Sequence, residues 1–560
     1  MEQFTLGWID ISIMVVYIIA MIWYGLKHAK QSNSEDYFLA GRNMTWPIVG
    51  ISLFAANISS TTLIGLAGDA YSTGISVFNY EWSAVVILVF FSMFFLPFYL
   101  KSKVYTMPEF LEKRFDSRSR YYFSFTTLVG NVLIETAAPL YIGSLIFEQV
   151  FPNISGSVII IILAVAAAAY TIPGGLSSVV HTEVIQAILL IIGSIILTYM
   201  TFDAVGGWGN VMAAMETKFA AGDLKNSPED MLSLIRPMDD PGVPWTGLVT
   251  GVPILGFYFW ANNQFMVQRV LSARNLDQGR KGALFGGLLK LPVILIMVLP
   301  GTMAIAMPES IFPALENPDL VYPALVFNLL PVAFKGLVLA GLLAAMSSSI
   351  SATLNSASTL ITMDFVAKIR PGLTSKQLVR AGQIATVVLV ILAASWAPNI
   401  KNFDSLFKYL QIVLAYIAPP VVAAFLSGLF WKRANGTGAF AGFIFGFIAG
   451  VLLIQYGDTL AAGVHEVIPK LALYNAETGT YYIHFLHIAT LLFIACVLVI
   501  VITSLVTAQP PVEKVAEMTY KKEIFTEETR ELEGKHWYEN YRTLSIILLL
   551  ITAVVVGIFW

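Results

Sequence analysis

Charged residues are scarce in this chain of 560 residues. Lys, Arg, Asp and Glu together make up 12% of it, whereas ordinary soluble domains have about 25%. Hydrophobic residues reach 57%, and the mean hydropathy is +0.74. Cysteine occurs once, at Cys496, so no disulfide can form within the chain. The net charge of −3 gives no indication of nucleic-acid binding. We therefore expect an integral protein of the lipid bilayer, with no nucleic-acid partner and no obligatory protein partner.

Motifs of catalysis and of nucleotide use are also missing. The sequence contains no phosphate-binding G-x-x-x-x-G-K-[ST] loop and no G-x-S-x-G nucleophile motif. His484 and His487 have no acidic or cysteine neighbour that would complete a metal site, so an interfacial histidine pair is the simpler interpretation. The sequence therefore favours neither an enzyme nor a nucleotide-driven pump.

Long apolar stretches are abundant. Stretches of about 18 or more mostly apolar residues predict membrane-spanning helices. We expect the first one to be a true span rather than a cleaved signal peptide, because residues 1–10 carry no Lys or Arg. The sequence predicts an all-α membrane protein of about 14 transmembrane helices, at 8–26, 47–70, 79–100, 121–149, 156–174, 181–203, 245–267, 283–307, 335–362, 380–398, 405–431, 437–457, 484–507 and 543–560.

The basic residues indicate how these spans are oriented. Of the 33 Lys and Arg residues, 25 fall in alternate loops, which the positive-inside rule assigns to the cytoplasm. This places both termini outside. Segment 508–542, with its alternating acidic and basic residues, reads as a solvated cytoplasmic linker that is helical in part. No loop is long enough for an independent domain of ordinary size, so we expect 1–560 to form a single transporter domain.

Two of the spans are interrupted by polar or helix-breaking residues. Span 47–70 carries the polar run Asn57-Ile58-Ser59-Ser60-Thr61-Thr62, and span 245–267 carries Gly251, Pro253 and Gly256 before Asn262-Asn263-Gln264. Each alone is equally well explained as a kink packed against neighbours. Five spans separate their starts, however, as a five-plus-five inverted repeat requires, and secondary transporters place their binding sites at such paired breaks. The matched placement favours a transporter.

A serine cluster in span 335–362 points to a cation. On a helix, the carbonyl of Ala345 and the hydroxyls of Ser348 and Ser349 lie one turn apart. These oxygens form half of a cage for a hard cation such as sodium, and the broken backbone of span 47–70 can supply the rest. A serine run by itself more often indicates close helix packing.

Three of the charged residues within predicted spans are candidates for the solute site. Lys290 is too far from either end of its span to reach the membrane surface easily, so we expect it to face an interior cavity, with Glu81 as its partner. Glu135 lies in the middle of span 121–149. We predict that it faces the interior, where it bonds a substrate hydroxyl or pairs with a cationic group.

The chain resembles the solute:sodium symporters and, within them, the sodium/glucose cotransporter branch. The matching segments extend over nearly the whole length. They are 35–42 (EDYFLAGR), 55–59 (AANIS), 80–82 (YEW), 105–110 (YTMPEF), 174–177 (GGLS), 268–269 (QR), 354–356 (LNS) and 430–433 (FWKR). The resemblance implies the fold named after a bacterial leucine transporter, with one extra helix (8–26) before the ten-helix core and three after it (437–560). The repeats would then be 47–203 and 245–431.

The resemblance also implies roles for individual residues. Sodium would be bound by the carbonyls of Ala55, Ile58 and Ala345 and by the hydroxyls of Ser348 and Ser349. Residues matching the sugar contacts of the family, or bordering them, are Asn57, Thr62, Glu81, Gly256, Trp260, Lys290 and Gln411, with Glu135 as an addition that matches no family role. Residues matching its gates are Leu66, Tyr80, Phe259 and Phe407.

The chain departs from the family at several of these positions. Thr62 replaces a Gln or His, Gly256 replaces an Asn or Thr, and Phe259 replaces a tyrosine. The leading hypothesis is sodium-coupled symport of a hexose or related polyol by alternating access. Alternatives are another solute such as sialic acid, inositol or a monocarboxylate, and a sensor that binds solute without transporting it. We expect a bacterial inner membrane as the location.

A second sodium site is expected to be weak. The residues that match this site in some relatives are Glu183, Ser351 and Ala352, and the last offers no side-chain oxygen. We therefore expect one sodium ion per solute, with Glu183 on the inward exit path.

Overall fold

The computed structural model describes residues 6–29, 33–308, 312, 318–402, 406–475 and 478–560, and gives no side chains for 133, 401–402 and 406–410. Within this part, 11 helices are long and apolar enough to cross a membrane, and a bent pair makes a twelfth span. The difference from the 14 predicted spans has two causes. One helix, Gly156–Ala204, contains two of the predicted spans. The predicted span 245–267 is interrupted, and neither of its pieces is long enough to cross a membrane alone.

The doubled helix is α10 (Gly156–Ala204), with 49 residues. A straight helix of this length would measure about 73 Å, more than twice the hydrocarbon thickness of a bilayer. It breaks at Gly175, where φ is +56° and ψ is −157°, next to Pro173. A side chain at Gly175 would also collide with the Tyr37 backbone. The predicted spans 156–174 and 181–203 are therefore the two arms of α10.

The two predicted interruptions are present. Helices α3 (Trp46–Asn57) and α4 (Ser60–Thr73) meet at an angle of 61°. The second interrupted span consists of α13 (Trp245–Phe257), the π-helical turn η4 (Tyr258–Asn262) and α14 (Gln264–Leu271), with extended backbone at Asn263. Both breaks expose backbone groups within the helix bundle rather than to lipid, which is where membrane proteins tolerate them.

The remaining spans overlap the predicted ranges, although the helix that begins at Gly436 continues to Val467, ten residues past the predicted end at 457. They are α1 (Trp8–Lys27), α5 (Asn79–Phe94), α8, η3 and α9 (Ser117–Gly130, Asn131–Thr136 and Ala137–Val150), α15, η5 and α16 (Leu276–Lys290, Ile294–Val298 and Leu299–Ala304), α18 (Phe334–Leu360), α20 (Ser375–Trp396), α21 (Leu406–Phe430), α22 (Gly436–Val467), α23 (Phe485–Val506) and α26 (Tyr541–Ile558).

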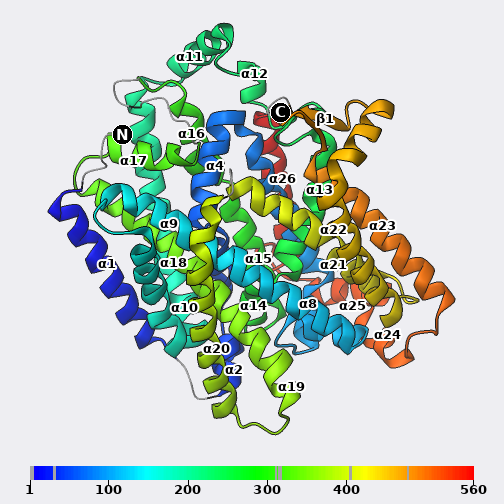
Figure 1. The fold of residues 1–560 in the computed structure, drawn as a ribbon. Coiled ribbons are helices and arrows are strands. Elements are labelled where there is room, and N and C mark those ends of the chain that lie inside the picture. The colour runs from blue at the N-terminus through cyan, green and yellow to red at the C-terminus, as the bar shows by residue number, and fades with distance from the viewer. Residues whose placement is uncertain (1–5, 30–32, 309–311, 313–317, 403–405, 476–477) are drawn as a thin grey trace.

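Short elements cover the two ends of this helix bundle. Helices α11 (Trp208–Ala221), α12 (Pro228–Met231) and α17 (Val321–Leu329) and the hairpin β1–β2 (Ala472–Asn475, Thr480–Ile483) lie toward one end (Figure 1). Helices α2 (Ser34–Leu39), α19 (Ala367–Ile369) and α24 (Val512–Met518) lie toward the other (Figure 1).

Hydrogen bonds place the start of α1 and the C-terminus on the side of the bundle where α11, α12 and α17 lie. The amide of Leu234 donates to the carbonyl of Phe559 at 2.8 Å. The carboxylate of Asp10 accepts from the amides of Ala333 and Gly336, each at 2.8 Å, at the start of α18. The two ends of the chain therefore lie on one side of the bundle, as the even number of spans requires.

The predicted linker 508–542 is helical in part and mostly exposed, as expected, but it also contacts the bundle. It forms α24 and α25 (Lys522–Leu532). Glu528 forms ion pairs with Arg280 of α15 and with Arg542 of α26, while Lys514 donates to the carbonyl of Phe115 at 2.5 Å. The alternating charges that suggested a solvated segment are thus partly used in contacts with other segments, which charge pattern alone does not reveal.

Candidate functional site

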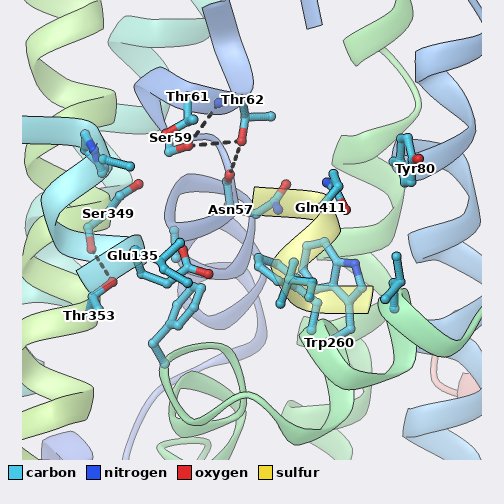
Figure 2. A pocket seen from close by; sticks show the side chains of 18 of the residues that line it. Asn57, Ser59, Thr61, Thr62, Tyr80, Glu135, Trp260, Ser349, Thr353 and Gln411 are labelled. Carbon is cyan, nitrogen blue, oxygen red and sulfur yellow. Dashed lines mark hydrogen bonds between the residues drawn. The ribbon is translucent and has the colours of Figure 1, made fainter. Parts of the chain in front are cut away.

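A cavity of about 130 Å³ lies where the two broken spans meet. Helices α3 and α4 contribute one wall, and α13, η4 and α14 contribute another (Figure 2). Residues of α5, η3, α9, α18 and α21 complete the lining. We call it the central cavity. Its polar or aromatic lining residues are Asn57, Ser59, Thr61, Thr62, Tyr80, Glu81, Glu135, Phe259, Trp260, Phe265, Ser349, Thr353 and Gln411, and Leu66 and Gly256 also line it.

The break between α3 and α4 is stabilised by its own hydroxyl groups. Ser59 caps α4 by accepting a hydrogen bond from the Thr62 amide at 3.0 Å. The Thr62 hydroxyl in turn donates to the carbonyl of Asn57 at 3.0 Å (Figure 2). Thr62 lines the cavity, as expected of a solute contact, but its hydroxyl already satisfies a carbonyl that the break exposes. The polar run in the sequence thus has a structural role as well as a place in the cavity.

Four of the five predicted sodium ligands lie together beside this break. The Ser348 hydroxyl is 3.1 Å from the carbonyl oxygen of Ala55 and 2.9 Å from that of Ala345. The Ser349 hydroxyl is 3.2 Å from the same Ala345 oxygen. Among the described residues, no donor is hydrogen-bonded to the Ile58 carbonyl, which the break removes from the helical pattern. Neutral oxygens that converge in this way suit a hard cation.

Glu81 and Lys290 form the expected ion pair, with 2.5 Å between the lysine Nζ and a carboxylate oxygen. Both are buried, at 5% and 0% exposure. The Lys290 ammonium also lies 5.4 Å from the ring centre of Trp260. The structure corrects one expectation, because only Glu81 lines the central cavity and Lys290 lies behind it. In this arrangement Lys290 holds and neutralises Glu81 rather than facing the solute directly.

Two smaller cavities adjoin the central cavity and share different lining residues with it. The first, here called the Asp69 cavity, shares Tyr80 and Gln411 with it. The second, the Asn263 cavity, shares Ile134, Glu135 and Leu414 with it. Tyr80 therefore lies between two cavities, which is the position of a gate. Leu66 and Phe259 line the central cavity, whereas the side chain of Phe407 lies outside the described part of the chain.

Glu183 and Ser351 are separately bonded. The carboxylate of Glu183 pairs with Arg269 of α14 and accepts from the Ser52 hydroxyl. The Ser351 hydroxyl lies 2.5 Å from that of Tyr170 and donates to the Ser347 carbonyl at 2.6 Å. The structure therefore does not bring the two into contact as a second cation site.

Several buried arginines were missed at the sequence level. Arg269 and Arg120 had been counted among the basic residues of cytoplasmic loops, but they are 1% and 4% exposed. Arg120 pairs at 2.6 Å with Asp364 of the π-helical turn η7 (Ile361–Val366), which follows α18, and the Thr106 hydroxyl donates to the same carboxylate at 2.7 Å. Neither arginine lines the central cavity. The position of Arg269 directly after a broken span was the one available signal that it is buried.

Comparisons with known proteins extend over most of the chain. A model of the sodium:solute symporter family matches residues 37–446. Sodium/glucose cotransporter 4 of Danio rerio is 33% identical over 561 residues, which cover 95% of this chain and 84% of that protein. The sodium/myo-inositol cotransporter of Mus musculus is 33% identical over 559 residues, covering 93% and 76%.

The fold has a counterpart among solved structures. A Na⁺-coupled sialic acid symporter in a substrate-bound, outward-open state superposes with a TM-score of 0.76 at 23% identity, covering 90% of this chain and 99% of that one. This likeness confirms the predicted all-α, leucine-transporter-type fold with its inverted-repeat core. The family match and the identity of a third along nearly the whole chain show that this protein belongs to the sodium:solute symporter family, a family of membrane transporters.

Proposed function

We propose that this symporter couples sodium to the uptake of a hexose or related polyol by alternating access. The observation that carries the proposal is the lining of the central cavity. It combines the Glu81 carboxylate, the Gln411 amide and the Asn57 amide with the indole of Trp260. Carboxylate and amide groups together accept from and donate to a ring of hydroxyls, and an aromatic face covers its apolar side. The glucose and myo-inositol cotransporters among the relatives support this substrate class.

The charges along the three cavities argue against an anionic solute. Asp69, Glu81 and Glu135 line them, whereas no Lys, Arg or His does so among the described residues. Lys290 pairs with Glu81 from outside the lining. A carboxylate-bearing solute would meet repulsion along this route, so sialic acid and monocarboxylates fit it poorly.

Sodium would bind Ala55, Ile58, Ala345, Ser348 and Ser349, beside the solute. Ser349 both belongs to this set and lines the central cavity, so an ion held there fixes one wall of the solute site. Sodium would thereby favour the state that binds solute, which is the reciprocal coupling that symport requires. Segments 47–203 and 245–431 would be the two repeats that move relative to each other.

The orientation and the location belong to the same proposal. The distribution of Lys and Arg places both termini outside the cell. The bacterial inner membrane expected from the sequence stays a prediction, and the two named relatives are animal proteins.

Uptake into proteoliposomes tests the proposal. Purified protein should accumulate at least one labelled hexose or cyclitol when sodium is higher outside. A negative interior should increase that accumulation, because each translocated charge gains about 2.3 kcal/mol per 100 mV. Equal uptake with potassium in place of sodium would refute sodium coupling. Binding of solute without accumulation would instead identify a sensor, and preferential uptake of sialate would overturn the proposed substrate class.

The separate bonding of Glu183 and Ser351 predicts one sodium ion per solute. Reversal potentials measured in proteoliposomes should give a coupling ratio of one, and Ser351→Ala should leave that ratio unchanged. The substitution removes a hydroxyl bonded to Tyr170, so a modest loss of stability, about 1 kcal/mol, is expected. A ratio of two that falls to one in Ser351→Ala would show that a second site forms in another conformation.

A further inference from the structure

Glu135 is a carboxylate that the proposed sugar site does not require. It lies in the π-helical turn η3 and lines both the central cavity and the Asn263 cavity. Figure 2 shows its side chain directed into the space between Asn57 and Trp260. In the part of the chain that the structure describes, no hydrogen bond or ion pair joins its carboxylate to another side chain.

An ionised Glu135 would have no basic counter-charge among the described residues that line the central and Asn263 cavities. The charge of Glu81 is already matched by Lys290, at 2.5 Å. An ionised carboxylate inside a membrane protein is costly unless a positive charge accompanies it. A species that enters the cavity is therefore expected to bring that charge.

Near Glu135, two buried amide oxygens lack a hydrogen-bond donor, although the hydroxyls of Thr127 and Tyr258 also line the Asn263 cavity. The side-chain oxygen of Asn57, which lines the central cavity, is buried and has no partner. The side-chain oxygen of Asn263, which lines the Asn263 cavity together with Glu135, is also buried and has no hydrogen-bond partner. A protonated amine has three donors and no acceptor, so it complements such a set better than a hydroxyl group does.

We propose that the transported solute is a polyol that carries a protonated amine, bound by Glu135 while the hydroxyls occupy the region of Glu81 and Gln411. This inference rests on the proposed function and narrows its substrate class to amino sugars and aminocyclitols. A rival role for Glu135 is that of counter-charge to bound sodium. The contacts argue against it, because no bond joins Glu135 to Ser348, Ser349 or the Ala345 carbonyl.

Paired substrates test the inference. Neutral hexoses and cyclitols, each matched with its monoamino analogue, are compared as competitors of sodium-driven uptake in proteoliposomes at pH 6.5. For the best pair, the wild-type protein should prefer the amine by about tenfold or more, as a charge-assisted hydrogen bond provides. Glu135→Gln, which keeps the shape and removes the charge, should bring the preference to about one. Glu216→Gln, at an exposed position on α11, is the matched control and should keep the wild-type preference.

Each other outcome has a distinct meaning. A wild-type protein without preference for the amine, or a Glu135→Gln variant that keeps the preference, overturns the inference. If Glu135→Gln instead raises the sodium concentration needed for half-maximal uptake of neutral and amino solutes equally, Glu135 is the counter-charge of sodium and the inference also falls. If the protein takes up only neutral polyols with sodium, the proposed function holds and the inference about the amine is wrong. If the wild-type protein accumulates neither solute of any pair, the proposed function itself fails and the inference fails with it.

Discussion

Replacing Lys290 by alanine is expected to reduce sodium-driven solute uptake by about 100-fold or more. The substitution leaves Glu81 buried at 5% exposure without the ammonium that lies 2.5 Å from it. A lone carboxylate at this depth either binds a proton or turns away, and both changes remove the negatively charged acceptor from the cavity wall. A loss of about 3 kcal/mol in binding corresponds to the stated factor.

The same substitution tests stability, because breaking a buried ion pair by removing one partner costs about 3–5 kcal/mol. The double variant Glu81→Gln/Lys290→Met removes both charges and should recover most of the thermal stability in detergent while uptake stays lost. Lys335→Ala, a lysine outside the cavity linings, serves as the control. A Lys290→Ala protein with unchanged apparent solute affinity would show that the ion pair is purely structural.

Features that depend on local sequence were predictable. The spans follow from runs of apolar residues, and the breaks lie at polar side chains such as Asn57 and Asn263, which compete with helical backbone. Pro253, by contrast, lies within α13 and does not end it. The convergence of Ala345, Ser348 and Ser349 follows from the helical period alone, since residues three and four apart share a face. The structure places all these features where the sequence indicated them.

Features that depend on contacts between distant segments were not predictable in this way. Arg269 and Arg120 look like loop residues in a hydropathy profile, because such a profile averages over neighbours and cannot show a partner 86 or 244 positions away. For the same reason the docking of segment 508–542 through Glu528 was missed. Lys290 was correctly paired with Glu81, but which of the two faces the cavity depends on side-chain packing, about which sequence spacing contains no information.

Removing the hydroxyl of Ser348 is expected to weaken sodium binding strongly. The Ser348 oxygen lies 3.1 Å from the Ala55 carbonyl oxygen of α3 and 2.9 Å from the Ala345 carbonyl oxygen of its own helix, α18. It therefore connects the two helices at the proposed cation site. The site consists of neutral oxygens, so each ligand carries a large share of the binding energy and a missing one must be replaced by water. Ser348→Ala should therefore raise the sodium concentration for half-maximal uptake by about tenfold or more.

The neighbouring serines make the experiment specific. Ser349→Ala should act in the same direction, whereas Ser347→Ala, which changes a partly exposed side chain outside the proposed ligand set, is expected to keep the wild-type sodium dependence. Uptake measured against external sodium at fixed membrane potential separates the three variants. Solute binding at saturating sodium should be largely retained in Ser348→Ala, because that side chain does not line the central cavity. A Ser348→Ala protein with wild-type sodium dependence would show that the cation binds elsewhere. The break between α3 and α4 would then have no role in ion coupling.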